Sequence, residues 1–386
     1  MDASAFKKPF GTLTNNNKGY LTFIPFRLPP KIKYDESLIA ILGEANYQLG
    51  ILNGLGKLIP NPNLLISPYL KREAVLSSKI EGTQASIMDI YNFEAEGKTD
   101  GNSEINRINE VINYIKSLNE CLNDISKGKK IDILMIKKAH KILMNNVRGQ
   151  ELTPGEFRTI QNWIGISGTK INDASYIPPP PEQVTELIQS LEGFINNPPG
   201  LISVLIQCAM IHYMFEAIHP FSDGNGRIGR LLISLFLIER KLLDQPLLYL
   251  SAYIERNKMN YYSLLLDISQ NSDWIKWIKF FIRGVIEQSK ESILSIQKIM
   301  ELKKRYEQKL NEEKSTRNMS MLVDYLFSNP IITTTSAERY LRITYRGAKK
   351  VIDSLIKNGI LEEYGSRQRD KKFIAHEIVS IIGNNT

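Results

Sequence analysis

The stretch HPFSDGNGRIGR, residues 219–230, decides how the centre of this chain folds. It follows IQCAMIHYMFEAI (206–218) and precedes LLISLFLI (231–238), and both flanks are apolar on nearly every side of a helix. Helices of that composition are buried in the core of a domain. We therefore expect two buried central helices, joined by a loop that gathers the densest polar cluster of the chain and faces a cleft.

The loop itself predicts a site for an anion. Its DGNG segment (223–226) favours a turn, whose backbone N–H groups can converge on a bound anion. The helix expected to open at Gly226 adds the partial positive charge of its N-terminus. Arg227 and Arg230 lie three residues apart, near one face of the first helical turn, so both can reach the same anion. This pattern indicates a polyphosphate.

Two more side chains of the loop suggest a reaction. Asp223 is expected to hold Mg²⁺, which takes one or two carboxylates together with phosphate oxygens. His219, at the junction of helix and loop, is a candidate to deprotonate an incoming hydroxyl. The combination indicates attack of a hydroxyl on a nucleotide phosphate. A P-loop is excluded, because GxxxxGK[ST] is missing and the glycine-rich loop follows a helix rather than a strand.

The stretch matches HxFx[DE]GNGRxxR at every fixed position and so resembles the signature of the Fic family. The resemblance covers most of residues 20–280 and includes SSKIEG (77–82), GEFR with NWIG (155–165) and YLSAYIERNKMNYY (249–262). Members of this family are mostly helical proteins that transfer a nucleotide monophosphate, typically AMP from ATP, onto a protein Ser, Thr or Tyr hydroxyl. The resemblance implies that fold and that activity here.

The resemblance also implies a role for each signature residue. His219 would be the general base, Asp223 would hold Mg²⁺ between the α- and β-phosphates, and Phe221 would anchor the loop from inside. The residues expected to bind ATP are Glu81, His219, Gly224, Asn225, Gly226, Arg227, Ile228, Gly229, Arg230, Tyr253, Tyr261 and Tyr262. For each of the three tyrosines, a place in the nucleobase pocket and an ordinary place in the core stay equally open.

SSKIEG fits [ST]xxxE[GN], an inhibitory pattern of the same family, with Ser77, Glu81 and Gly82 at its fixed positions. Ser77 and Glu81 are one helical turn apart and share a face. In similar proteins this glutamate pairs with the second arginine of the signature, here Arg230. An arginine held by a carboxylate is not free to hold a γ-phosphate. We favour this brake over a surface glutamate that merely ends a helix, which places the chain in the N-terminally inhibited subclass.

The other segments predict a mainly α-helical chain, a Fic-type helical bundle with a small β-hairpin flap. The expected elements are an extended arm over 1–34 and helices over 35–56, 68–82, 104–122 and 131–144. A β-hairpin is expected at 157–181, where β-branched and aromatic residues surround a turn and four prolines follow. Its strand edge, with Trp163, Ile164 and Gly165, would dock the target protein.

The sequence pattern divides the chain into four regions, and the C-terminal one differs from the rest. Residues 1–115 are expected to form an N-terminal helical region, 116–285 the catalytic core and 286–317 a charged helical linker. Residues 318–386 predict three short helices and a basic hairpin, the pattern of a winged helix-turn-helix. This segment carries ten Lys and Arg against seven Asp and Glu, a net charge of +3 that is weak for DNA. DNA binding is therefore open but not favoured over protein docking.

Composition bounds the remaining possibilities. A net charge of +8 and a pI of about 9.1 favour anionic partners without identifying one. The two cysteines, both in helical apolar contexts, indicate a reduced compartment. The N-terminal residues lack the apolar region of a signal peptide, and no run is long enough to cross a membrane. We therefore expect a cytoplasmic protein that does not bind membranes.

The sequence thus favours a protein adenylyltransferase that takes ATP and Mg²⁺ and modifies an unidentified target protein, with Glu81 as its brake. Two alternatives stay open. With Glu81 orienting a water, the same site could remove AMP from a modified protein. The chain could also be a transcriptional regulator whose core only senses nucleotide. Self-modification and a homodimer are compatible with either enzyme.

Overall fold

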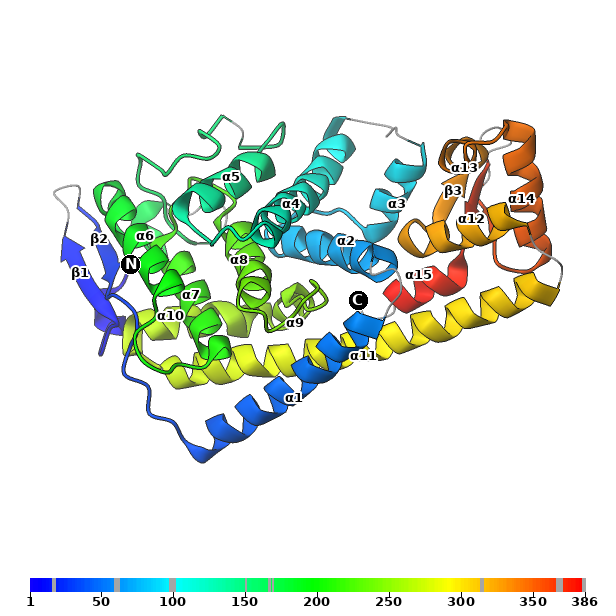
Figure 1. Cartoon of the computed structure of the whole chain (residues 1–386). Coiled ribbons are helices and arrows are strands. Elements are labelled where there is room, and N and C mark those ends of the chain that lie inside the picture. Colours follow the sequence, from blue (N-terminus) through cyan, green and yellow to red (C-terminus); the bar gives the residue numbers. More distant parts are fainter. Residues whose placement is uncertain are drawn as a thin grey trace.

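The structure is a computed structural model that describes residues 1–15, 19–58, 63–96, 102–149, 151–165, 168, 170–312, 316–365 and 371–383. The molecule is elongated, with a two-stranded hairpin at one end and the C-terminal helices at the other (Figure 1). Helix α1 (Glu36–Leu58) and the long helix α11 (Trp274–Glu312) pack against each other along one side. The shorter helices lie on one side of this pair (Figure 1).

The two central helices are where the sequence predicts them. They are α7 (Val204–Ile218) and α8 (Asn225–Glu239), which pack against one another. Every side chain of α7 from 205 to 215 is buried, and so is every position of α8 from 225 to 237. Helix α8 begins at Asn225, one residue earlier than expected, because Gly224 takes the left-handed conformation (φ 76°) that ends the loop.

Helices predicted from the N-terminal half are confirmed, with shifted ends. The helices that surround α7 and α8 are α2 (Asn63–Ile80), α4 (Asn102–Ser126), α5 (Ile133–Leu143), α6 (Pro181–Asn196), α9 (Ser251–Arg256) and α10 (Lys258–Asn271). Helix α2 starts about a turn ahead of Pro68 and ends at Ile80, so Glu81 lies in the turn that follows it. A further helix that we did not predict, α3 (Ile87–Glu96), comes next.

The extended arm predicted over residues 1–34 is wrong for residues 1–25, whereas residues 26–34, which include the two prolines, form no helix or strand. A short 3-10 helix, Ala3–Ala5 (η1), is followed by two antiparallel strands, β1 (Gly11–Asn15) and β2 (Leu21–Pro25). Phe23 anchors this hairpin: its ring is fully buried, and its N–H donates to the Ile177 carbonyl at 2.9 Å. Burial of that aromatic ring stabilises the hairpin, which no strand pattern in residues 1–25 led us to predict.

The hairpin expected at 157–181 is reduced to one antiparallel bridge, between Ile164 and Tyr176. A 3-10 turn, Ile171–Asp173 (η2), lies between the two bridged residues. The Ile177 carbonyl pairs with β2 and the Tyr176 hydroxyl donates to the Ala217 carbonyl at 2.8 Å, so this arm of the hairpin pairs with other elements. Residues 166, 167 and 169 lie outside the described part of the chain.

The linker expected at 286–317 is not a separate element. Helix α11 runs without a break from Trp274 to Glu312, and its buried side chains continue to Leu310 because α1, α12 and α15 pack on it. Among the described residues, no helix combines the length and the apolar character that crossing a bilayer requires.

The C-terminal segment contains the predicted helices and hairpin. Its elements are α12 (Arg317–Ser328), β3 (Ile331–Thr333), α13 (Thr334–Leu341), α14 (Tyr345–Lys357), β4 (Glu362–Tyr364), β5 (Lys372–Ile374) and the unpredicted α15 (His376–Gly383). The strands form an antiparallel sheet in the order β3-β5-β4. The winged helix-turn-helix interpretation of this segment stays a prediction. Helix α12 packs on α2 and β3 packs on α3, so this module contacts the N-terminal helices (Figure 1).

Candidate active site

The signature loop is a closed unit between α7 and α8. Asn225 closes it, because its Oδ1 accepts from the Phe221 N–H at 2.8 Å and its Nδ2 donates to the Phe221 carbonyl at 2.7 Å. The Phe221 ring is fully buried beneath the loop, as predicted from the resemblance. His219 caps the end of α7 in the left-handed conformation (φ 51°). These contacts fix the imidazole relative to the start of α8.

The protonation state of His219 follows from its backbone contact. Its Nδ1 lies 3.2 Å from the carbonyl oxygen of Glu216, which can only accept a hydrogen bond. Nδ1 therefore carries the proton in the neutral ring, and Nε2 keeps its lone pair. Burial lowers the pKa of His219 to about 4, so the ring is neutral at pH 7. Its side chain stays 20% exposed, which leaves a reactant a way to it.

Glu216, one turn before His219, was not predicted to belong to the site. Its Oε2 lies 4.0 Å from His219 Nδ1, and its Oε1 is buried without a hydrogen-bond partner among the described residues. Oε1 packs so closely over Gly229 that a Cβ there would clash, which explains the glycine at this position of α8. Burial raises the pKa of Glu216 to about 8. The carboxyl group is therefore mostly protonated at pH 7.

His140 of α5 holds the signature loop through its ring. Its Nδ1 accepts from the Gly155 N–H at 2.9 Å, so Nε2 carries the proton and donates to the Asp223 carbonyl at 3.0 Å. Its ring stacks on Phe221 with the ring centroids 3.8 Å apart. His140 is not among the predicted site residues, and these contacts give it a structural role in holding the signature loop.

Arg158 and Asn162 hold the loop from the flap side, and we did not predict either as a site residue. The guanidinium of Arg158, which is buried, donates from Nε to the His219 carbonyl at 2.9 Å. Asn162 Nδ2 donates to the Phe221 carbonyl at 3.0 Å. No pattern in the sequence marks either residue, because the burial of Arg158 and its need for acceptors become visible only in the folded chain.

Arg227 provides donors for an anion at the N-terminus of α8. Its side chain is 5% exposed and its Nη1 lies 3.6 Å from Glu110 Oε2. Neither its Nε nor its Nη1 has a hydrogen-bond partner among the described residues. A buried guanidinium with unused donors, next to free N–H groups of a helix start, is the setting in which proteins bind phosphate.

Arg230 is paired with Glu81. Its Nη2 lies 2.6 Å from Glu81 Oε1, and its Nε and Nη2 each donate to Ser77, at 2.9 Å, to the hydroxyl and the carbonyl respectively. Arg230 is 2% exposed and Glu81 is 35% exposed. Burial raises the pKa of Glu81, but the charge and hydrogen bond of Arg230 outweigh burial, so the pKa lies below its ordinary value. The ion pair is therefore formed at pH 7.

Glu81 also covers the start of α8. Its Oε1 lies so close to Gly226 that a Cβ at that position would clash with it. The turn that carries Glu81 is held in place: Gly82 takes the left-handed conformation (φ 95°), and Lys258 Nζ donates to the Ile80 carbonyl at 2.6 Å. A carboxylate thus lies where the helix N-terminus would otherwise attract another anion.

The donor set for a metal ion is one carboxylate. Asp223 Oδ1 accepts from the Gly224 N–H at 2.6 Å, and Oδ2 faces Gly149. Among the described residues no group of three or more His, Cys, Asp or Glu could hold a metal. A single carboxylate beside an anion site fits Mg²⁺ bound to a polyphosphate, because the phosphates and water supply its other ligands.

The three tyrosines occupy different surroundings. Tyr262 is 40% exposed, with Lys258 Nζ 5.9 Å from its ring centre. Burial raises its pKa, the charge of Glu81 raises it further, and the charge of Arg230 opposes that rise. Tyr261 is buried and its hydroxyl bonds to His212 Nε2 at 2.8 Å. Tyr253 packs against Phe280 of α11. The structure thus brings Tyr262 beside the signature and places Tyr253 against α11.

The flap residues keep their place beside the signature even though the hairpin is short. Trp163 is 42% exposed, Gly165 is exposed, and Ile164 forms the bridge to Tyr176. Tyr176 in turn is bonded to the carbonyl of Ala217, two residues before His219. The remaining predicted site residue, Ile228, belongs to the first turn of α8, and its side chain is buried in the core.

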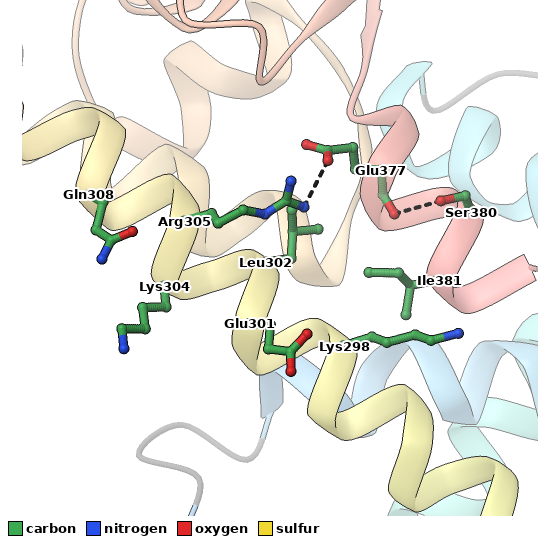
Figure 2. A pocket seen from close by; sticks show the side chains of 9 residues that line it. All are labelled: Lys298, Glu301, Leu302, Lys304, Arg305, Gln308, Glu377, Ser380 and Ile381. Carbon is green, nitrogen blue, oxygen red and sulfur yellow. Dashed lines mark hydrogen bonds and ion pairs between the residues drawn. The ribbon is translucent and has the colours of Figure 1, made fainter.

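A hollow of about 610 Å³ lies at the other end of the molecule, between α11 and α15 (Figure 2). Charged side chains dominate its lining, and Arg305 forms an ion pair with Glu377 at 2.8 Å across it (Figure 2). No residue of the signature lines this hollow. It is separate from the site around His219.

Comparisons with known sequences identify the family of the chain. The model described as "Fic/DOC family N-terminal" matches residues 39–123 and the "Fic/DOC family" model matches residues 130–237, together half of the chain. Over 203 residues the chain is 29% identical to "Probable protein adenylyltransferase aq_aa38" of Aquifex aeolicus (strain VF5), covering 52% of this chain and 56% of that protein. "Protein adenylyltransferase Fic" of Culex quinquefasciatus is 28% identical over 206 residues, covering 52% and 37%. The chain thus spans 56% of the length of the first relative and 37% of the second.

Solved structures show the same fold. A Fic family protein from Desulfovibrio desulfuricans G20 superposes with a TM-score of 0.57 at 18% identity, covering 90% of this chain and 98% of that one. Fic-1 from C. elegans superposes with a TM-score of 0.53 at 21% identity, covering 68% and 74%. At these identities the likeness concerns the fold alone. With the two family models and the complete signature, it establishes that this chain belongs to the Fic/DOC family.

Proposed function

We propose that the site around His219 transfers AMP from ATP to a hydroxyl group of a target protein. The observation that carries this proposal is a neutral imidazole whose Nε2 lone pair is free, fixed beside two buried arginines at a helix N-terminus. A base and a polyphosphate site in one loop suit nucleotidyl transfer better than simple nucleotide sensing. The relatives named adenylyltransferases support the same activity.

The reaction follows from the positions of these groups. His219 Nε2 takes the proton of the target hydroxyl, whose oxygen forms a bond to the α-phosphorus of ATP. The bond from that phosphorus to the bridging oxygen breaks, and pyrophosphate leaves. Arg227, Arg230 and the N–H groups that begin α8 stabilise the charge that develops on the leaving phosphates. The target keeps AMP as a phosphodiester, and His219 returns its proton to solvent.

Asp223 is the residue that would hold Mg²⁺. The ion supplies charge neutralisation to the phosphates when it is bound. His140 contributes by fixing the Asp223 backbone through the carbonyl contact described above. The ordered carbonyl keeps the loop, and with it the carboxylate, beside the start of α8.

We further propose that Glu81 inhibits the site in this conformation. It takes the Nη2 donor of Arg230 and covers Gly226, so a triphosphate cannot use both contacts while the pair persists. ATP would then bind with its α-phosphate displaced from the line of attack. Release of Glu81 frees both groups at once.

The flap would orient the target. Trp163 and Gly165 are exposed beside the bridge at Ile164, and a strand of the target can pair with backbone there. Pairing between backbones depends little on the sequence of the target strand. Other contacts between the two proteins would therefore decide which target is modified.

Removal of AMP is the second candidate, and the exposure of Glu81 favours it. A carboxylate that is 35% exposed and held by Arg230 can orient a water toward a phosphodiester. In that reaction the water oxygen would bond to phosphorus as the bond to the target oxygen breaks. Glu81 would take the proton of the water, and the target oxygen would take a proton from His219 once its Nε2 has bound one from solvent. The two reactions share every residue and differ in what Glu81 does.

ATP labelled at the α-phosphate and ATP labelled at the γ-phosphate distinguish AMP transfer from other chemistry. The Glu81→Gly protein is incubated with Mg²⁺ and a candidate target extract, once with each labelled ATP. Protein should become labelled from α-labelled ATP and should stay unlabelled with γ-labelled ATP. Intact mass of the modified protein should rise by one AMP. Retention of the γ-label, or no labelling of the chain or of any target, would contradict the proposal.

A further inference from the structure

We propose that Glu110 of α4 is a positioning residue for Arg227. Its carboxylate holds the Arg227 guanidinium by charge and leaves the N–H donors of that guanidinium for the outer phosphates of ATP. The inference rests on the proposed function and names a residue of the site outside the signature and the inhibitory pattern. It concerns a carboxylate that reaches the signature from a helix more than a hundred residues earlier in the chain.

The contact between Glu110 and Arg227 is an ion pair without a hydrogen bond. Arg227 Nη1 lies 3.6 Å from Glu110 Oε2, and the two side chains are 5% and 15% exposed. A guanidinium buried this deeply needs a nearby opposite charge. Because the Nε and Nη1 donors have no hydrogen-bond partner among the described residues, Glu110 supplies that charge without using them.

A second contact fixes the carboxylate itself. Thr83 Oγ1 donates to Glu110 Oε2 at 2.5 Å, the same oxygen that faces Arg227. Thr83 belongs to the turn after α2, where its N–H donates to the Ser78 carbonyl at 3.1 Å. The oxygen nearest the guanidinium therefore cannot rotate away without losing a charge-assisted hydrogen bond.

The two arginines thus differ in how their donors are used. Arg230 donates three hydrogen bonds to Ser77 and Glu81, so it must exchange a partner before it can hold phosphate. Arg227 has unused donors and needs no exchange. Removing Glu81 should therefore help the nucleotide, whereas removing Glu110 should harm it. This difference in sign separates a positioning carboxylate from a second inhibitory one.

Titration calorimetry on the full chain tests the inference with two nucleotides, ATP and AMP. In the Glu81→Gly background, Glu110→Gln should weaken ATP binding about fivefold to tenfold and leave AMP binding unchanged, because only ATP carries the outer phosphates. Thr83→Val should give a smaller loss in the same direction. In the Arg227→Gln background, Glu110→Gln should have no further effect on ATP. AMP transfer should show a raised KM for ATP with kcat nearly unchanged.

Glu120→Gln is the matched control, since Glu120 lies on the same helix, is exposed and pairs with Lys138. It should alter none of these constants. Tighter ATP binding by Glu110→Gln would overturn the inference and show that Glu110 competes with the phosphates. Equal loss for ATP and AMP would overturn it in favour of a merely structural role. In either case ATP binding and transfer by Glu81→Gly itself would leave the proposed function standing, whereas their absence would remove both.

Discussion

The neutral state of His219 depends on one backbone contact and on burial. The Glu216 carbonyl selects the tautomer, and desolvation keeps the pKa near 4. Glu216 itself is mostly protonated at pH 7, because burial raises its pKa to about 8, so it adds little negative charge beside the ring. The imidazole is thus ready to accept a proton over the whole physiological range.

His219→Ala should abolish transfer and leave ATP binding within about twofold of the parent. The contacts that we assign to phosphate come from Arg227, Arg230 and the start of α8, and the ring meets only the hydroxyl. The measurement is ATP affinity by calorimetry together with AMP incorporation, both in the Glu81→Gly background. Wild-type incorporation by the alanine variant would mean that another group is the base.

The pH dependence of transfer follows from the lowered pKa of His219. A base must be unprotonated, so kcat/KM should stay flat as the pH falls from 8 to about 5 and should drop only as it approaches 4. An imidazole of ordinary pKa, 6.5, would lose most of its activity within that range. Rates of the Glu81→Gly protein between pH 5 and 8, with circular dichroism as the folding control, measure this. A midpoint near 6.5 would contradict the assigned environment.

At the scale of elements, the turn that carries Glu81 depends on the end of α2. Lys258 of α10 donates to the Ile80 carbonyl at 2.6 Å, which places a cation at the C-terminus of that helix. Lys79 adds an ion pair to Glu255 of α9 at 2.9 Å. The position of Glu81 is therefore set by two helices that follow the signature in the chain.

Lys258→Met should loosen this turn. We expect a stability loss of about 0.5–1 kcal/mol and a rise of a few fold in basal AMP transfer, since Glu81 would leave Arg230 more often. Melting curves and incorporation rates of the otherwise unchanged protein provide the two readouts. Lys276→Met, which removes an exposed lysine paired with Asp273 on the surface, is the control. Unchanged transfer in Lys258→Met would show that α10 does not hold the brake.

Sequence patterns predicted those elements whose periodicity is strong. The buried helices α7 and α8 and the polar loop between them follow directly from apolar spacing and from the glycines of DGNG. The predicted hairpin failed because the Tyr176 arm bonds to β2 and α7, which no local pattern records. Arg158 and Glu110 were missed for the same reason, since each reaches the signature only through the tertiary fold.

At the scale of the whole molecule, the C-terminal module contacts α2, the helix that ends just before Glu81. Lys71 of α2 is 6% exposed, and its Nζ lies 2.6 Å from Glu94 Oε2. The same nitrogen donates to the Ser328 carbonyl and to Asn329 Oδ1, each at 2.9 Å, at the end of α12. One lysine therefore joins α2, α3 and the C-terminal module, ten residues before Glu81.

Lys71→Met should weaken that junction. Loss of a buried, fully bonded cation should lower stability by about 1–3 kcal/mol and increase hydrogen exchange in α2. Because α2 carries Glu81 at its end, AMP transfer should rise as well. Arg305→Met is the matched control, as it breaks an ion pair of the same module that does not involve α2 (Figure 2). Faster exchange in α2 without faster transfer would show that the module and the brake are independent.

The most direct test of the account compares wild type with Glu81→Gly. Loss of the Arg230 pair, which is only partly desolvated, should lower stability by about 1–3 kcal/mol, and Mg-ATP should restore part of it. AMP incorporation from α-labelled ATP should nevertheless rise about tenfold or more, because Arg230 and Gly226 become available to the phosphates. A variant that is less stable and more active is the predicted result. Incorporation no higher than in wild type would contradict the inhibitory role of Glu81 and favour its use in removing AMP.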